Sequence, residues 1–220
     1  MIEKVLNSRA WSIFVAIQTK IRRAKNKAKL RNSKITILSS NCTGGIIYHE
    51  LGLSFLSPTI NIRIPSNDFV RFILNAEEYL KKELVFFQSD EDCPAAYLGD
   101  IPIYFVHYKT EEESRNKWEE RKKRINWGNV YVILNDRDGV THEDILALQK
   151  ANYRNMVVFT SKQYEDCPNS FYMSQFAGQP EVGYTLGHIP RTGEWYFEHY
   201  FDYVAWLNSD HENCEKFRKK

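Results

Sequence analysis

Short β-branched runs alternate with amphipathic segments through most of residues 35–160, and this alternation constrains the fold more than any other feature of the chain. The candidate strands are 35–39, 59–64, 84–88, 101–107, 129–134 and 155–160. The candidate helices are 44–51, 67–81, 110–125, 142–150 and one near 198–207. Several strands are apolar on both faces, as strands covered on both sides must be. We therefore predict an α/β fold, a three-layer α/β/α arrangement around a mostly parallel sheet.

Residue types at the ends of the candidate helices support these assignments. Thr110 and Thr141 are each followed three residues later by an acid, the pattern of a capping box. Ser66 can cap the helix that follows it, and Gly52 suits a helix C-terminus. These local signals place four of the predicted boundaries.

The length and the cysteines limit the domain organisation. A chain of 220 residues hides roughly 70% of its surface on folding, so one core suffices without disulfides. The four cysteines are too far apart for a zinc knuckle or a redox pair, which favours a reducing, cytoplasmic setting. Since no linker follows Tyr164, we expect the aromatic tail to pack on the same core. The sequence thus predicts one domain over residues 34–220.

A strongly basic segment precedes this domain. Residues 1–34 hold ten Lys or Arg side chains and one acid, a net charge of +9, whereas the remaining residues are −7. Within residues 2–30, apolar or small side chains recur every three or four positions: Leu6, Ala10, Ile13, Phe14, Ile17, Ile21, Ala24 and Ala28. That spacing predicts a basic amphipathic helix over residues 1–33.

Three roles for this helix remain open at the level of sequence. It can dock on the body or on a partner chain, lie on an anionic membrane surface, or bind nucleic acid. We expect no nucleic-acid partner, because the body is acidic. The longest uncharged run, Ala10 to Thr19, is about half of the ~20 residues that cross a bilayer. A cytoplasmic protein is predicted, peripheral at the inner face of the membrane if the helix lies on lipid.

The loop after the first predicted strand is a candidate ligand site, because ligands bind beyond the carboxyl ends of parallel strands. We assign Asn41, Thr43, Gly44 and Gly45 to substrate binding, since exposed N–H groups at a helix start attract phosphate. The same position lowers a thiol pKa, so Cys42 is a candidate nucleophile. The alternative is a buried cysteine that acts as a small apolar side chain.

A second candidate loop follows the strand at 129–134. Asp136 and Asp138 are one residue apart and can share a divalent cation that bridges a diphosphate. Arg137 is assigned to substrate binding, and Asp136 is also a candidate general base. The alternative is a tight turn in which an aspartate pairs with Arg137.

The third candidate loop contains His107 and Lys109, before the helix that Thr110 begins. His107 can act as an acid or base together with Cys42, and Lys109 can neutralise phosphate. His49, on the helix after Gly45, is placed in the same crevice. For each histidine the alternative is a hydrogen-bonded structural residue.

Several phrases of the sequence resemble a known family. The phrases are SNCTGGIIYHELGL, SPTINIRIPSNDFVRF, LGDIPIYFVHYKTEEESRNKWEERKKRINWGNVYVILNDRDG, NMVVFTSK and FDYVAWLN. They resemble a bacterial family of exopolysaccharide or capsule biosynthesis proteins built on a domain of unknown function and often labelled polysaccharide acetyltransferase. The resemblance covers roughly residues 34–208 and leaves the basic helix outside. It implies a role in making or decorating surface polysaccharide, and it brings no catalytic residues.

Together these features predict a transferase that acts on an activated sugar or glycan intermediate. In acyl transfer from acetyl-CoA, Cys42 or a hydroxyl activated by His107 is the nucleophile, and N–H groups of Thr43 to Gly45 stabilise the oxyanion. In transfer from a nucleotide sugar, Asp136 and Asp138 hold a metal ion. The alternative is a non-catalytic sugar-phosphate-binding protein that assembles or regulates the polysaccharide machinery.

Overall fold

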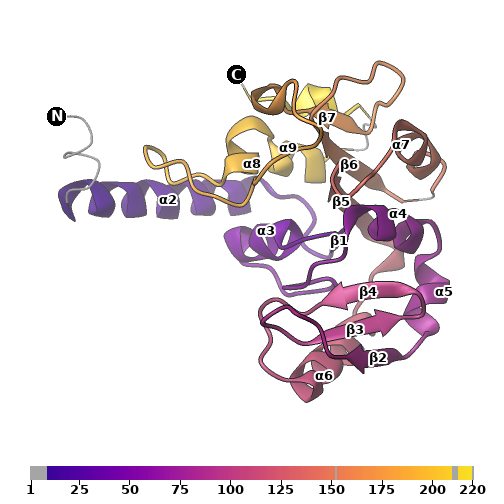
Figure 1. The fold of residues 1–220 in the computed structure, drawn as a ribbon. Coiled ribbons are helices and arrows are strands. Elements are labelled where there is room, and N and C mark those ends of the chain that lie inside the picture. Colours follow the sequence, from indigo (N-terminus) through magenta and orange to yellow (C-terminus); the bar gives the residue numbers. More distant parts are fainter. Residues whose placement is uncertain (1–8, 152, 210–212, 220) are drawn as a thin grey trace.

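A four-stranded parallel sheet lies at the centre of the computed structural model, which describes residues 9–151, 153–209 and 213–219 (Figure 1). Its strands, in spatial order, are β1 (Thr36–Ser39), β5 (Val130–Asn135), β6 (Asn155–Thr160) and β7 (Ser170–Tyr172). Every residue of β1, β5 and β6 is buried. The α/β fold and its parallel sheet are therefore as predicted.

Helices cover both faces of this sheet. Ile37 and Ile133 face a core shared with α3 (Thr43–Leu51), α8 (Tyr196–Tyr200) and α9 (Tyr203–Leu207). Leu38 and Val132 face a second core with α4 (Ser66–Leu74), α5 (Ala76–Lys81) and α7 (His142–Leu148). Successive strand residues point to opposite faces, so one sheet can bury both cores. The three layers and the return of the tail to the core agree with the prediction.

A second sheet departs from the predicted arrangement. The strands β2 (Leu84–Phe87), β3 (Ala95–Leu98) and β4 (Ile101–Tyr104) form an antiparallel sheet, followed by α6 (Glu111–Lys122). The predicted strands 84–88 and 101–107 thus pair with β3, which was missed, and not with the parallel sheet. Short connections allow only antiparallel neighbours, because a parallel pair needs a long crossover. The predicted strand 59–64 is also wrong: it is mostly turn, with one isolated bridge from Arg63 to Tyr104.

Most helix boundaries follow the local signals. Thr110 accepts from the N–H of Glu113, and Thr141 forms the predicted capping box. Gly52 ends α3 with a φ of 62°, in the left-handed region that glycine tolerates. Ser66 is the exception. It is the first residue of α4, and its N–H donates to Oδ2 of Asp138 at 2.8 Å, so the cap comes from the loop after β5.

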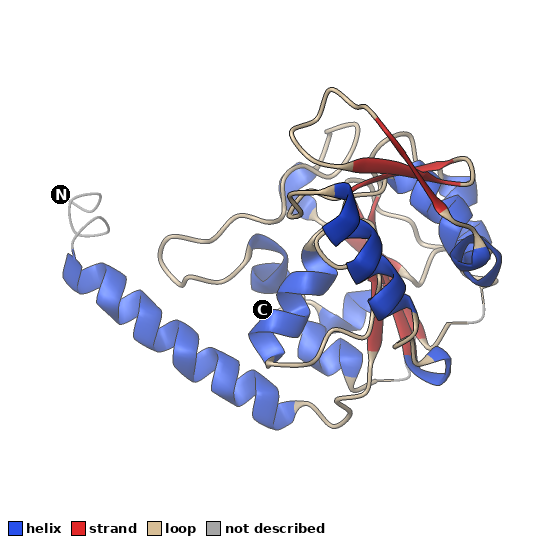
Figure 2. Ribbon diagram, turned by 90° about the horizontal axis from the view of Figure 1, so that it is seen from below, coloured by secondary structure: helices blue, strands red, loops and turns tan. Residues whose placement is uncertain are grey.

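Helix α2 (Arg9–Lys29) is the described part of the predicted basic helix, and residues 1–8, including Leu6, lie outside the described residues. It packs on α3, and its N-terminal half projects from the body (Figures 1 and 2). Arg22 pairs with Glu198 at 3.0 Å, and Arg23 pairs with Glu50 at 2.6 Å. Among the described helices, none has the length and hydropathy of a membrane span.

Candidate functional site

A cleft of ≈ 300 Å³ lies at the carboxyl edge of the parallel sheet. The polar residues that line it are Ser40, Asn41, Arg63, Ser66, Glu91, Arg137 and Asp138, and we call this site the edge cleft. Because β1 and β5 are parallel neighbours, the residues that follow them meet at one edge. The N–H of Ser40 still donates to the carbonyl of Ile133 at 3.1 Å, which fixes the loop after β1 against β5.

The hydroxyl of Ser40 is unpaired in this cleft. Ser40 is only 2% exposed, and its Oγ has no hydrogen-bond partner among the described residues. Its backbone is held on both sides, because its carbonyl also accepts from the N–H of Ile64 at 2.9 Å. Buried polar groups are almost always hydrogen-bonded. The hydroxyl therefore has hydrogen-bonding capacity that no described contact uses.

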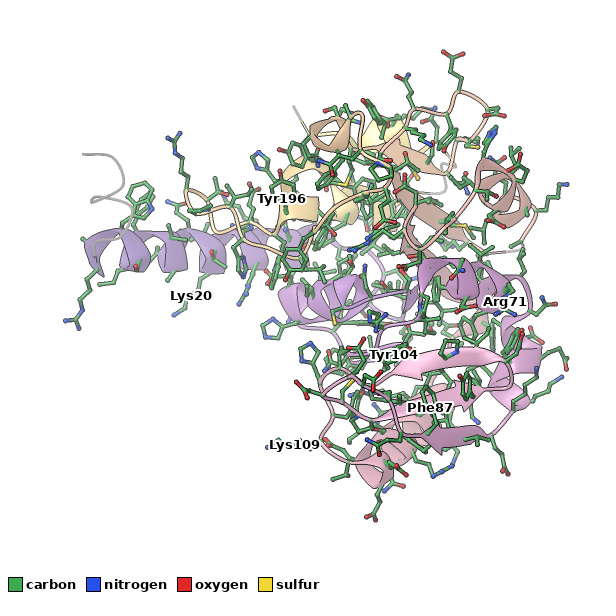
Figure 3. The ribbon with its side chains drawn as sticks, in the orientation of Figure 1. Lys20, Arg71, Phe87, Tyr104, Lys109 and Tyr196 are labelled. Carbon is green, nitrogen blue, oxygen red and sulfur yellow. The ribbon has the colours of Figure 1, made fainter. Side chains whose placement is uncertain are left out.

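Two arginines of the edge cleft form ion pairs that are weak because they are exposed to solvent. Arg63 pairs with Glu91 at 2.7 Å and lies 4.1 Å above the ring of Tyr104 (Figure 3). Arg137 pairs with Glu181 at 3.4 Å. All four charged side chains are more than one-third exposed, and ion pairs at such exposure contribute about 0–1 kcal/mol. A phosphate can therefore compete for both guanidinium groups, whose planar geometry suits its oxygens.

Strained backbone is found at the same edge. Asn61 and Asp138 have φ of 61° and 56°, and they are the non-glycine residues with positive φ in the described chain. Such conformations cost about 1–3 kcal/mol and persist only where the surroundings enforce them. Asp138 is held by the N–H of Ser66 and by its own N–H, which donates to Glu181 at 3.0 Å. The cleft wall is therefore a fixed conformation.

Asp136 points away from the lining of the edge cleft. Its Oδ2 accepts from both the N–H and the hydroxyl of Ser161, and its Oδ1 accepts from the N–H of Val182. Since Asp136 is buried and three donors hold its carboxylate, it ties the loop after β5 to two other segments. Oδ2 of Asp138 is likewise used by Ser66. Catalysis by Asp136, and a metal ion shared with Asp138, remain predictions.

Cys42 differs from the predicted reactive thiolate. It is the residue before the first turn of α3, as the sequence indicated, but burial raises the pKa of its thiol. A raised pKa keeps the proton on sulfur at neutral pH, which is the opposite of what a nucleophile needs. The raised pKa does not support nucleophilic catalysis by Cys42, which stays a prediction.

The glycines after Cys42 serve the packing of α3. A Cβ at Gly44 would lie 3.0 Å from the Cβ of Ser39, so the glycine lets α3 approach β1 closely. Gly45 is also buried, against Asn61. The N–H and the hydroxyl of Thr43 both donate to Oδ1 of Asn41, at 2.9 and 2.6 Å. The predicted ligand role of Gly44, Gly45 and Thr43 stays a prediction, while Asn41 reaches the cleft.

The predicted histidines lie elsewhere on the surface. His49 and His107 are exposed, and neither is among the residues that line the edge cleft. Lys109 lines a second, more open cleft of ≈ 580 Å³, which shares Glu91 with the first (Figure 3). The structure therefore brings together Asn41, Arg137 and Asp138 from the predicted set. Their roles there remain untested.

Three residues of the edge cleft were missed by sequence reasoning. Ser40 directly follows β1, and the strand-end rule that selected Asn41 applies equally to it. Arg63 was read as part of a strand of the parallel sheet, but it forms an isolated antiparallel bridge with Tyr104, and it lines the cleft. Glu91 is in the acidic loop between β2 and β3, where no local pattern distinguishes it from its neighbours.

A separate cluster joins the first residue of α7 to the loop after β6. The ligand atoms of His142, Asp166 and Cys167 lie within 4.8 Å of one another. Nε2 of His142 is already hydrogen-bonded to Oδ1 of Asp166 at 2.9 Å, and His142 stacks on Tyr164. Burial raises the pKa of Cys167 to about 11, so its thiol keeps its proton. These contacts account for the cluster without an ion, and we assign no metal to it.

Comparison with known proteins gives a family but no activity. A family profile described as "Domain of unknown function (DUF1919)" matches residues 13–208. An uncharacterized protein of Haemophilus influenzae is 36% identical over 180 residues, which are 82% of this chain and 87% of the relative. The profile begins inside α2, so the shared region does not start at residue 34 as the resemblance had suggested. Neither description mentions polysaccharide, capsule or acetyl transfer.

Proposed function

The chain belongs to the family of the domain of unknown function DUF1919, and from that premise we propose that its edge cleft binds the phosphate groups of an activated sugar. The observation that carries the proposal is that two exposed, weakly paired arginines, Arg63 and Arg137, line one cleft together with Ser40. We further propose that the bound sugar is used in making a bacterial surface polysaccharide. That second step is supported only by the resemblance of the five sequence phrases quoted above.

The recognition chemistry follows from the two arginines. A phosphate carries more charge than one carboxylate and can accept two parallel hydrogen bonds from a guanidinium group. Glu91 and Asp138 line the cleft as well, so the empty cleft holds equal numbers of acidic and basic side chains. Binding therefore requires Arg63 and Arg137 to leave Glu91 and Glu181, which their exposed, weak pairing permits.

Sugar transfer fits this cleft better than acyl transfer. An acceptor hydroxyl attacks the anomeric carbon, the bond from that carbon to the diphosphate oxygen breaks, and the diphosphate leaves with the electron pair. Arg63 and Arg137 stabilise the departing charge, and the carboxylate of Glu91 or Asp138 takes the acceptor proton. Acyl transfer through Cys42 loses support because burial raises the pKa of its thiol.

The test uses the full chain with uridine diphosphate and inorganic pyrophosphate as probes, titrated by calorimetry with magnesium and with chelator. We expect Arg63→Gln and Arg137→Gln each to weaken binding by about tenfold or more, since a charged hydrogen bond is lost. Arg71→Gln is the matched control, because Arg71 is an exposed, paired arginine on α4 outside the cleft (Figure 3). Equal loss in all three variants, or no binding by the native protein, contradicts the proposal.

Binding without turnover is the second candidate, and the environment of Asp136 favours it. That carboxylate directly follows β5, beside the cleft residues Arg137 and Asp138, yet its hydrogen bonds to Ser161 and Val182 hold loops together. Incubation with a panel of nucleotide sugars, followed by mass spectrometry of the products, separates the two. Binding of uridine diphosphate without any product from the panel supports a regulatory or assembly role.

A further inference from the structure

Helix α2 presents its large apolar side chains to the solvent. Ile13, Phe14, Ile17 and Ile21, which we call the α2 stripe, are 54%, 47%, 51% and 44% exposed. The small residues that continue the stripe, Ala24 and Ala28, are exposed as well. Clustered apolar side chains on a surface mark an interaction site. The sequence predicted this stripe, but the structure shows that it does not dock on the body.

The opposite face of α2 makes the contact with the body. A Cβ built on Gly193 would lie 2.7 Å from Cγ1 of Val15. The helix therefore lies very close to the loop that contains Gly193. Further along, Arg22 and Arg23 pair with buried acids of α8 and α3, and Asn26 donates to the hydroxyl of Tyr203 at 3.2 Å. The attachment is thus mostly polar, and it fixes the helix with the α2 stripe outward.

Lysines flank the α2 stripe on both edges. At about 100° per residue, Lys20 and Lys27 lie along one edge, and Lys25 and Lys29 lie along the other. All four are exposed, and residues 9–29 contain no acid (Figure 3 labels Lys20). This is the pattern of a helix that lies in a membrane interface, with apolar side chains in the acyl region and cations among the phosphates.

We propose that the α2 stripe docks the protein on an anionic lipid surface, with α2 parallel to that surface. The stripe from Ile13 to Ile21 is about 12 Å long, and its attraction to lipid combines apolar burial with the charge of the lysines. This inference is independent of the proposed function of the edge cleft.

Charge complementarity favours an anionic lipid surface over a second copy of the chain or a nucleic acid as the partner of the α2 stripe. If the stripes of two copies paired, Lys20 and Lys25 of each copy would lie beside the lysines of the other, and like charges oppose that contact. Nucleic acid would satisfy the lysines but leave Phe14 and Ile17 in water. An anionic bilayer satisfies both parts of the surface at once.

The test is sedimentation of the full chain with vesicles of phosphatidylcholine, with or without phosphatidylglycerol. We expect binding to the anionic vesicles that weakens with added salt. Replacing Phe14 and Ile17 together by Gln lowers the partition coefficient by about tenfold or more, since two apolar side chains no longer enter the lipid. The control replaces Leu74 and Val85 by Gln, exposed apolar residues of the body, and leaves binding unchanged.

A second pair of variants tests the charge. Lys20→Gln with Lys25→Gln lowers binding to the anionic vesicles by about thirtyfold, because two cations that attract the anionic surface are removed. Lys81→Gln with Lys117→Gln is the matched control on the body. Equal binding of all variants, or no binding by the native chain, overturns the proposal. So does gel filtration that shows a dimer dissociated by the Phe14 and Ile17 changes, which would assign the α2 stripe to contact between copies.

Discussion

The attachment of α2 and the edge cleft both use arginines, but they hold them differently. Arg22 is 17% exposed and its partner Glu198 is fully buried, whereas Arg63 and Glu91 are 39% and 49% exposed. A buried pair cannot lose one member without leaving a charge in a low-dielectric interior, while an exposed pair can exchange its partner for water or a ligand. The exposure of the acid therefore separates arginines that hold the fold from arginines available for binding.

The largest expected effect is at the buried pair. Arg22→Gln leaves the carboxylate of Glu198 without its partner and lowers the free energy of unfolding by about 3 kcal/mol. Urea titration followed by circular dichroism measures this change. Arg63→Gln, as the control from the edge cleft, changes stability by about 0.5 kcal/mol or less.

The double variant Arg22→Gln with Glu198→Gln sharpens the result. It removes both charges, so we expect it to recover most of the stability lost in Arg22→Gln. If Arg22→Gln and Arg63→Gln prove equally mild, exposure does not distinguish the two kinds of arginine and the comparison fails.

A smaller effect is expected at Asp136, the buried acid that no arginine holds. Asp136→Ala removes the acceptor for Ser161 and Val182 and costs about 2 kcal/mol, because buried donors are left unpaired. Thermal unfolding measures the loss. Asp136→Asn tests the catalytic role separately from the structural one. It keeps one oxygen that accepts a hydrogen bond, but it removes the carboxylate that could act as a base. A variant that is stable but inactive in nucleotide-sugar turnover would restore the catalytic role predicted from the sequence.

The smallest expected effect is a dependence of stability on pH. The two acids that pair with α2, Glu50 and Glu198, change the stability in opposite directions as the pH rises. Burial raises the pKa of Glu50, but hydrogen bonds from Arg23 and Trp195 outweigh it and leave that pKa below its ordinary value. Its contribution is therefore present above the ordinary pKa and is lost as the pH falls through the folded pKa. Burial raises the pKa of Glu198, so its contribution is present at low pH and is lost as the pH rises.

Single substitutions separate these two contributions. Glu198→Gln leaves only the effect of Glu50, so we expect a steeper loss of stability below about pH 4.5, the ordinary pKa region of a glutamic acid. Arg23→Gln removes the interaction that lowers the pKa of Glu50, so the loss on the acid side becomes smaller. Urea titrations across the acid range measure both. A slope that neither variant alters would show that other groups control acid unfolding.

Local and strongly periodic features were predictable from the sequence. The strands at 130–135 and 155–160 are apolar on both faces, and the caps at Thr110 and Thr141 depend on residues three positions away. The missed strand, Ala95–Leu98, contains two alanines, which have low strand propensity, and its partners come from tertiary pairing. The hydrophobic pattern of the sequence therefore did not predict the antiparallel sheet.

Site residues that directly follow a strand could be predicted from the sequence. Properties that depend on burial or on tertiary contacts could not. The loop after β5 gave Arg137 and Asp138, and the loop after β1 gave Asn41. The pKa of Cys42 depends on what covers the thiol, and the position of Arg63 depends on a tertiary bridge to Tyr104 that no local pattern indicates. Similarly, the α2 stripe is periodic in the sequence, but which face meets the body depends on Glu50 and Glu198.

The cap that Asp138 supplies to α4 has a consequence for affinity. Since Oδ2 of Asp138 completes the first turn of that helix, the loop after β5 cannot move away without leaving the N–H of Ser66 without its partner. The wall of the edge cleft is thus ordered before any ligand arrives, and little conformational entropy is lost on binding. For the phosphate binding proposed above, this ordered wall lowers the entropic cost of holding even a small ligand.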